Sequence, residues 1–350
     1  MANYFMEELV IIGGGVAGLG CLNALLNKNI SPLLLEASSI GSPKMCGEFL
    51  APAVIERLKT WGIGPIQPIK QAQFFGINNA LRFSFPREAG AYSRHDAELA
   101  LATRATQQGG RIREQSPLKE IIPATNHTPF ILNLNSGESI QAHDVIFATG
   151  RFSKPMSTSA YVGFKTHLSQ IVQPETLLMF SLTGGYLGIV PVTSETSNLT
   201  CLIKKEVVAR KGSCRAFLDS IFSSLLESDN LNGTLTPLNW LEGAVPSFGV
   251  KTTPNWPHAY WIGDAVASIH PAIGYGFAHS LSSALLAADY YLKRDPIGYH
   301  QAVKRIIRPK RMIGQCMHSL LQKPQLCNTI ASMLRANTWL AHRLLKTLDY

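Results

Sequence analysis

The sequence has few charged residues and few cysteines for its length. Asp, Glu, Lys and Arg make up 16% of the 350 residues, whereas hydrophobic residues make up 46%, which is the reverse of the balance in a disordered chain. The six cysteines include no Cys-x-x-Cys pair and no Cys/His cluster with zinc-ligand spacing. These absences exclude a disulfide scaffold, and they predict reduced thiols, a cytoplasmic location and no metal site.

Long hydrophobic runs and internal repeats are also absent. The longest apolar run, residues 9–26, follows Glu7 and Glu8 and lacks the basic start of a signal peptide. No other uncharged stretch is apolar enough to predict a membrane span. Glycine and proline show no triplet period, which excludes a collagen-like chain. The length predicts two ordinary domains.

Acidic residues are rare at the end of the chain. Residues 1–292 carry equal numbers of basic and acidic residues, so the whole net charge of +9 lies in residues 293–350, where Asp295 and Asp349 are the only acids. One interpretation is two packed helices with a solvated basic face. The other is a docking surface for an anionic membrane or an acidic carrier protein. No nucleic-acid-binding signature accompanies the charge, so nucleic acid is not expected.

The first forty residues contain a strand, a glycine turn, a helix and a second strand. Residues 8–12 are an apolar strand, residues 13–18 read Gly-Gly-Gly-Val-Ala-Gly, residues 16–28 are typical of a helix, and residues 32–36 predict a strand that ends at Glu36. This order and spacing are typical of a dinucleotide-binding unit.

Each part of this unit has a physical task. Gly13 permits a tight turn, Gly15 lets a pyrophosphate approach the backbone, and Gly18 lets the helix pack closely on the sheet. Val16 and Ala17 begin the helix, whose free N–H groups and positive dipole end favour phosphate. Glu36 can accept hydrogen bonds from an adenosine ribose and would repel a 2′-phosphate.

A second strand-turn-helix unit follows much later. Residues 259–264 form an apolar strand that ends in Gly263 and Asp264, and Pro271, Gly274 and Gly276 precede a helix expected over residues 277–292. Asp264 therefore lies at the carboxyl end of a strand, where open α/β sheets bind ligands. The alternative is an ordinary corner with a capping Asp.

The middle of the chain has a different pattern. Strand-length runs alternate apolar and polar residues within residues 156–256, and residues 71–92 are similar, which predicts an antiparallel sheet. At the C-terminus, helices are expected over residues 299–321 and 325–346, with Pro309 and Pro324 breaking the run.

These motifs together resemble FAD-dependent oxidoreductases of the p-hydroxybenzoate hydroxylase superfamily, and most closely their geranylgeranyl-reductase-like branch. The resemblance covers residues 7–292. Four motifs carry it: the glycine turn with Glu36, the segment Lys44-Met-Cys-Gly-Glu48, Arg94 with Glu98, and the stretch from Trp261 through Pro271 to Gly276.

The resemblance implies an α/β (overall α+β) fold. Its Rossmann-like FAD-binding domain comprises residues 1–70, 93–155 and 257–292, its antiparallel-sheet substrate domain comprises 71–92 and 156–256, and basic C-terminal helices occupy 293–350. The implied FAD-binding residues are Gly13, Gly15, Val16, Ala17, Gly18, Glu36, Lys44, Cys46, Gly47, Arg94, Gly263, Asp264, Pro271, Gly274, Tyr275 and Gly276.

Substrate and catalytic residues follow from the same comparison. Tyr186, Gly188 and Pro191 match a strand that lies over the flavin, with Gly188 where the family has Trp, which widens the expected substrate cavity. Cys46 and His270 are the catalytic candidates. A free Cys is more often a small core residue, and a loop His is more often hydrogen-bonded than a general acid.

The sequence thus predicts an FAD-dependent oxidoreductase for an apolar or aromatic substrate that a lipid or carrier protein presents. A reductase or dehydrogenase of the geranylgeranyl-reductase-like type is the first interpretation. A monooxygenase that uses O2 and NAD(P)H is the second, and a non-catalytic flavin-binding protein is the third. Residues 148–150 read Ala-Thr-Gly where aromatic hydroxylases usually have Asp-Gly, so NAD(P)H stays open as an external electron donor.

Overall fold

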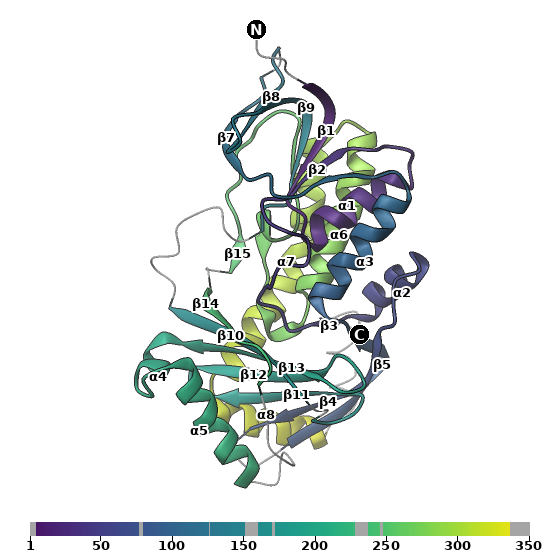
Figure 1. Ribbon diagram of the computed structural model, residues 1–350. Helices are drawn as coiled ribbons and strands as arrows, with labels where there is room; N and C mark the ends of the chain where they lie inside the picture. The colour runs from purple at the N-terminus through teal and green to yellow at the C-terminus, as the bar shows by residue number, and fades with distance from the viewer. Residues whose placement is uncertain are drawn as a thin grey trace.

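The computed structural model describes residues 5–76, 80–125, 127–150, 160–169, 172–227, 237–245 and 248–336. Two sheets, one above the other in Figure 1, organise the molecule, and helices pack on each. None of the helices in these ranges is long and apolar enough to cross a membrane.

The first sheet is assembled from segments that are distant in the sequence. Its strand order is β6-β2-β1-β9-β8-β7, and β16 pairs with the other part of β9. The strands are β1 (Phe5–Ile12), β2 (Leu33–Leu35), β6 (Arg111–Arg113), β7 (Leu118–Ile122), β8 (Phe130–Leu134), β9 (Ser139–Phe147) and β16 (Ala259–Trp261). β1 is parallel to β2 and β9, and β16 is parallel to β9. The predicted α/β unit, split in sequence, is confirmed.

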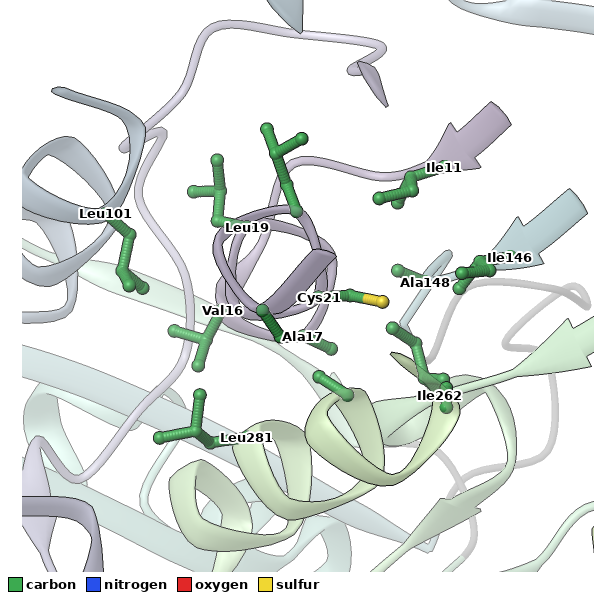
Figure 2. Packing of buried hydrophobic residues seen from close by; sticks show 14 of the residues in the cluster. Ile11, Val16, Ala17, Leu19, Cys21, Leu101, Ile146, Ala148, Ile262 and Leu281 are labelled. Atoms are coloured by element: carbon green, nitrogen blue, oxygen red, sulfur yellow. The ribbon is translucent and has the colours of Figure 1, made fainter. Parts of the chain in front are cut away.

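Helix α1 (Val16–Leu26) lies at the centre of this unit because its sequence is small and apolar on all sides. Figure 2 shows it between β1, β9, α3 (Arg94–Gln107) and α6 (Gly276–Leu292). Leu19 and Cys21 are fully buried on opposite sides of the helix. Burial raises the pKa of the Cys21 thiol, so this cysteine is a packing residue rather than a nucleophile.

The second sheet has eight strands in the order β14-β10-β13-β12-β11-β4-β5-β3. They are β3 (Phe49–Leu50), β4 (Gln67–Phe75), β5 (Ala80–Ala91), β10 (Tyr161–Leu168), β11 (Thr176–Leu182), β12 (Gly185–Pro191), β13 (Ser197–Lys204) and β14 (Leu241–Val245). β4 and β5 lie in one sheet with β10 to β14, whereas the predicted domain bounds stay a prediction. The sheet is not wholly antiparallel, however, because β4 and β11, which belong to separate hairpins, meet in parallel.

The remaining elements before α6 cover the second sheet or connect the two sheets. They are α2 (Pro52–Thr60), α4 (Lys205–Ala209), α5 (Cys214–Glu227), the short pair β15 (Gly249–Val250) and β17 (Ala267–Ser268), and the 3₁₀ turns η1 (Gly263–Ala265) and η2 (Pro271–Ile273). Phe217 and Leu218 of α5 are buried against Phe164 and its neighbours on the sheet, so α5 covers the face of the sheet that lies away from the first sheet (Figure 1).

Two C-terminal helices connect the sheets. α7 (Pro296–Leu321) packs on α6 and reaches β11 and β12, and α8 (Pro324–Ala336) packs on β5 and β11. The prediction that Pro309 breaks the run is wrong, because α7 continues through it. Pro309 lies on the exposed face, where the backbone groups that it leaves unpaired can be solvated. The predicted helical residues 337–346 lie outside the described residues.

Candidate functional site

A single large cavity is lined by both sheets and by the C-terminal helices. Its volume is about 1690 Å³, which exceeds the roughly 300–1,000 Å³ that is usual for a small-molecule pocket. One end is formed by the glycine turn and Glu36, and the other by the second sheet, α7 and α8. The cavity therefore has room for an extended ligand and a second molecule.

The glycine turn follows the predicted division of tasks. Gly13 has a φ of +112°, which favours glycine, and a Cβ on Gly18 would lie 1.8 Å from the Gly13 carbonyl oxygen. A Cβ on Gly15 would meet nothing closer than Nη2 of Arg94 at 3.4 Å, and Gly15 lines the cavity. Gly13 and Gly18 are thus required by the fold, whereas the face of Gly15 is open to a ligand.

Glu36 lies directly after β2 and also lines the cavity. One carboxylate oxygen accepts from Gly14 N–H at 2.5 Å, and the other accepts from the backbone N–H of Ser38 at 3.0 Å and from its hydroxyl at 2.8 Å. Burial by itself would raise the pKa of Glu36, but the hydrogen bonds from Ser38 and Gly14 outweigh it and lower the pKa. The ionised carboxylate keeps acceptor capacity for a sugar hydroxyl.

A buried carboxylate holds two cations beside the glycine turn. Glu98, which is fully buried, accepts from Nε of Arg94 at 2.6 Å and from Nζ of Lys44 at 2.7 Å. Two positive charges and one negative charge leave a net positive charge next to the N-terminus of α1. This end of the helix has no acidic residue in its first turn, and the arrangement is suited to an anion such as a pyrophosphate.

The second strand-turn-helix unit reaches the same cavity beside the start of α1, since a Cβ on Gly263 would lie 2.8 Å from that of Ala17. Asp264 follows β16 in η1, and Asp264, Pro271, Gly274 and Gly276 all line the cavity. Gly274 has a φ of +57°, and a Cβ on Gly276 would meet nothing within 4 Å. Gly263 and Tyr275, the other two predicted residues of this unit, are buried beside the cavity and do not line it.

The segment from Lys44 to Glu48 forms the middle of the cavity, between its two ends, which we call the waist. All of its residues line the cavity. The sulfur of Cys46 accepts from the Glu48 N–H at 3.3 Å, and the Cys46 carbonyl accepts from Nδ2 of Asn198 on β13 at 3.2 Å. Cys46 therefore has a fixed position where the two sheets meet.

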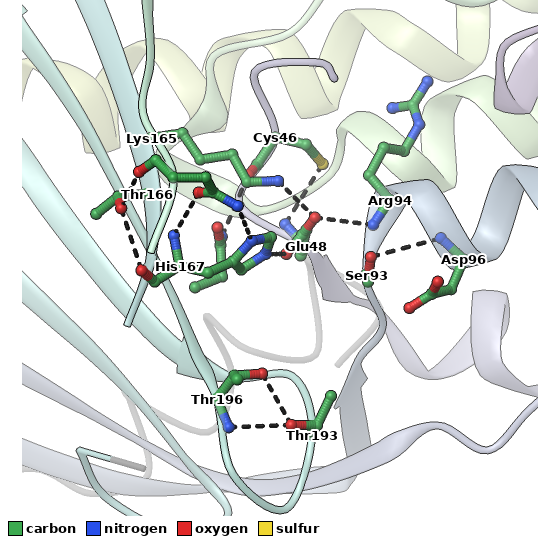
Figure 3. Close-up of polar contacts among 12 residues, drawn as sticks. Cys46, Glu48, Ser93, Arg94, Asp96, Lys165, Thr166, His167, Thr193 and Thr196 are labelled. Atoms are coloured by element: carbon green, nitrogen blue, oxygen red, sulfur yellow. Dashed lines mark hydrogen bonds and ion pairs between the residues drawn. The ribbon is translucent and has the colours of Figure 1, made fainter. Parts of the chain in front are cut away.

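Glu48 is the centre of a buried ionic cluster that the sequence did not predict (Figure 3). Its carboxylate contacts Nζ of Lys165 at 2.5 Å and Nε2 of His167 at 2.7 Å, both on β10, and it accepts from Arg94 N–H at 2.8 Å. Burial alone would raise the pKa of Glu48, but His167 and Lys165 outweigh it and lower the pKa. The cluster joins the Lys44–Glu48 segment to the second sheet.

The far end of the cavity is apolar. Tyr186 and Gly188 line it as predicted, but Pro191, the third residue predicted from that strand, does not. Gly188 faces the thioether of Met179, since a Cβ there would lie 3.0 Å from the sulfur. Additional lining residues that the sequence analysis missed are Phe74, Phe83, Phe85, Leu177, Leu320 and Ile330. For Phe74 on β4 and for Phe83 and Phe85 on β5, the alternation of apolar and polar residues was the available signal.

His270 lies outside the cavity lining. Its ring stacks on His318 of α7, with 4.2 Å between ring centroids, and its Nε2 pairs with Gln315 at 2.8 Å. Nδ1 of both histidines is buried without a hydrogen-bond partner among the described residues. The structure thus places His270 in a packed histidine pair that does not line the cavity.

This histidine pair predicts a loss of stability in acid. Burial lowers the pKa of both rings, and that of His318 falls to about 4. Because the unfolded chain takes up protons below about pH 6.5 and the folded pair does not, the stabilisation is complete above pH 6.5 and is lost between pH 6.5 and about 4. We expect the free energy of unfolding to fall by up to about 1.4 kcal/mol per pH unit per histidine. Denaturant titrations over this pH range should show a smaller change in the free energy of unfolding per pH unit for His318→Leu. The exposed His127→Leu should show the same change as the wild type. If the free energy of unfolding depends on pH equally in the wild type and both variants, the histidine pair does not have the lowered pKa described.

Comparison with known proteins finds similarity in structure alone. No protein-family model matches the chain, and no curated protein matches it in sequence. Among solved structures, a geranylgeranyl bacteriochlorophyll reductase-like protein from Thermoplasma acidophilum matches with a TM-score of 0.78 and 17% identity, over 94% of this chain and 91% of that one. The chain has the fold of FAD-dependent oxidoreductases.

Two further structures have the same fold and different reactions. PqsL of Pseudomonas aeruginosa, described as a probable FAD-dependent monooxygenase, matches with a TM-score of 0.75 and 13% identity, over 92% of this chain and 98% of that one. The flavin-dependent brominase Bmp2 matches with a TM-score of 0.74 and 15% identity, over 98% and 93%. The fold is thus common to reductase-like, monooxygenase and halogenase proteins, and the reaction has to be argued from the site.

Proposed function

We propose that this chain binds FAD in its large cavity and acts as an FAD-dependent oxidoreductase on an apolar or aromatic substrate. One observation carries the proposal: the same continuous cavity is lined by Gly15, Glu36 and Arg94 at one end and by the aromatic residues of β4 and β5 at the other. A nucleotide site and an apolar chamber are thereby joined without a barrier.

The residues at the nucleotide end fit the adenosine diphosphate half of FAD. The open face of Gly15 and the net positive charge around Glu98 suit the pyrophosphate. Glu36 is held by three hydrogen bonds and retains acceptor capacity for ribose hydroxyls. Asp264 and the open Gly276 face the same cavity, where a carboxylate and bare N–H groups can bind the ribityl chain and the ring.

The residues at the waist and the apolar end would orient a substrate against the ring. FAD, when bound, supplies the two-electron redox chemistry. The Lys44–Glu48 segment fixes the thiol of Cys46 at the waist, and Tyr186, Gly188 and Phe74 form an apolar wall that excludes water. A small residue at Gly188 leaves room for a bulky substrate.

A reductase or dehydrogenase is the reaction that we favour. Its support is the Lys44–Glu48 segment and the absence of Asp-Gly after β9, where the chain has Ala148-Thr149-Gly150. A monooxygenase is the second candidate, because PqsL covers nearly the same length with the same fold. An external NAD(P)H donor is compatible with either reaction.

One experiment separates these reactions. The purified protein is reduced anaerobically with dithionite and mixed with oxygenated buffer while the absorbance spectrum is recorded. Return of the oxidised spectrum in one phase supports the reductase, whereas a transient spectral species before that return supports the monooxygenase. A bound flavin that dithionite does not reduce would support a non-catalytic protein, and a protein without flavin absorbance contradicts all three.

We further propose that an anionic lipid surface presents the substrate to the cavity. The exposed side of α7 carries the basic face formed by Lys304, Arg305, Arg308 and Arg311, with Met312 beside it 60% exposed. α7 contains no acidic residue, and within the described part of the chain none of these four side chains forms an ion pair. The face continues to a group of residues that are both exposed and part of the cavity lining, namely Cys316, Ser319, Lys323 and Leu326.

Vesicle flotation tests this surface. We expect binding to vesicles that contain anionic phospholipid and none to neutral vesicles, because each surface base contributes about 1 kcal/mol near an anionic membrane. Arg305→Glu/Arg308→Glu/Arg311→Glu should abolish binding, whereas the control Lys59→Glu/Lys119→Glu/Lys211→Glu, with the same change of charge elsewhere, should bind. Equal failure with both vesicle types contradicts the lipid surface.

A further inference from the structure

Three potential metal ligands meet at a gap in the first sheet, away from the large cavity. β8 pairs with β9 as far as Ala142, and β16 begins to pair with β9 at Val145. His143 and Asp144 occupy the gap between these two pairings, and His258 comes immediately before β16. Strands that are distant in the sequence therefore bring two imidazoles and one carboxylate to the same point.

The three side chains are already in contact. Nδ1 of His143 lies 2.8 Å from one oxygen of Asp144, and Nδ1 of His258 lies 3.2 Å from the other. The two imidazole rings are 4.6 Å apart. One ligand atom from each residue lies within 4.8 Å of the other two. Asp144 is buried, whereas both imidazoles are partly exposed, so an ion has a route from solvent.

We propose that His143, Asp144 and His258 bind a divalent metal ion of the zinc class. Imidazole nitrogen and carboxylate oxygen are ligands that first-row metals from iron to zinc accept. Zinc binds both at about 2.0–2.2 Å, which places neighbouring ligand atoms of a tetrahedron about 3.4 Å apart. The contacts of 2.8 and 3.2 Å reach this spacing with small rotations of the rings. As the ion binds, the proton on each Nδ1 leaves to solvent and Nε2 takes one up, so that each imidazole binds the ion in its neutral form.

The surroundings leave a coordination position open. Asp144 and His258 line a second hollow of about 370 Å³, which Tyr260, Arg294 and His300 also line. The positive charge of Arg294, which also lines this hollow, disfavours a cation, while Asp295 and Glu8 are the nearby acids, which affect the pKa of Tyr260 and Tyr291 respectively. Three protein ligands of net charge −1 thus bind the ion, and a water or an anion drawn by Arg294 completes the shell.

Trp256 gives the site a spectroscopic reporter. It lines both the second hollow and the large cavity, and its ring lies 5.7 Å from those of Phe147 and Trp261. A bound paramagnetic ion such as Ni²⁺ should therefore quench part of the tryptophan fluorescence. The proposal does not rest on the flavin, so the metal-binding experiment is independent of it.

Equilibrium dialysis of the chelator-treated protein against Zn²⁺, followed by metal analysis, tests the site. We expect about one equivalent that is lost in His258→Ala and Asp144→Asn, with affinity reduced at least about 10-fold. His300→Ala is the matched control, since His300 lines the same hollow without belonging to the cluster, and it should bind Zn²⁺ like the wild type.

Melting temperatures keep the test decisive if a variant is unstable. Zn²⁺ should raise the melting temperature of the wild type and of His300→Ala, and should leave that of the milder variant His143→Gln unchanged, because only an ion that binds the folded protein stabilises it. Ni²⁺ should likewise quench the tryptophan fluorescence of the wild type and of His300→Ala, and should not quench that of His143→Gln. Wild-type protein that binds no Zn²⁺, or cluster variants that bind it as the wild type does, would overturn the proposal.

Discussion

Gly15→Val should give a folded protein that has lost FAD. The space at Gly15 is open on the cavity side, with Nη2 of Arg94 at 3.4 Å from the position of a Cβ, so the side chain disturbs the apoprotein little. A valine there occupies the place where a pyrophosphate approaches the backbone. We expect at least a 100-fold weaker affinity (about 2.7 kcal/mol) for FAD, measured by fluorescence titration of the apoprotein.

Two controls separate a lost ligand from a lost fold. Gly18→Val should fail to fold, because its Cβ would lie 1.8 Å from the Gly13 carbonyl oxygen. Ala53→Val, at an exposed position of α2, should fold and bind FAD normally. A Gly15→Val protein that purifies yellow with wild-type affinity would show that this turn does not hold the pyrophosphate.

Glu48→Leu should lower the free energy of unfolding by about 3–5 kcal/mol. The carboxylate is the partner of Lys165, and removing it leaves the Lys165 ammonium, whose side chain is 9% exposed, without its counter-charge. Lys165→Met in the same chain should restore much of the loss, because the double variant no longer buries an unpaired charge. Urea unfolding of the four proteins in this cycle measures the coupling.

The same cluster has a defined pH dependence. Its hydrogen bonds and cations hold the pKa of Glu48 below the ordinary value. Its stabilisation is therefore present above about pH 4.3, the ordinary value for Glu, and is lost as the pH falls through the lower pKa of the folded state. If Glu48→Leu and Glu48→Leu/Lys165→Met are equally unstable, or if neither differs from the wild type, the cluster does not join the Lys44–Glu48 segment to the second sheet as described.

Local sequence patterns predicted the parts of the fold that depend on local geometry. Glu36 ends a strand that pairs in register beside β1, and Asp264 follows β16, because a short apolar run and a glycine turn determine both positions. The parallel pairing of β4 with β11 was not predictable, since it depends on two hairpins meeting in space. The effect of Pro309 could not be predicted, because it depends on which face of the helix is solvated.

The residues of the candidate site likewise include some that local patterns predict and others that depend on distant contacts. The backbone geometry of Gly13 and Gly18 could be predicted because it is set within six residues, and the role of Gly15 toward a pyrophosphate stays a prediction. The partners of Glu48 lie 117 and 119 residues away on β10, and no spacing rule connects them. The expectation of no metal site rested on ligand spacing, which cannot detect Asp144 and His258, 114 residues apart. His270 was placed near the flavin by its neighbour Pro271, but its side chain packs on His318.

The flavin content of the purified protein is the most direct test of the proposal that this chain binds FAD. The full chain is purified without added cofactor, its visible spectrum is recorded, and the ligand released by denaturation is identified by chromatography and mass. We expect about one FAD per chain, retained after dialysis at neutral pH and restored when the apoprotein is mixed with FAD. A colourless protein that does not take up FAD, or one that binds FMN instead and leaves the end at Glu36 empty, would contradict it.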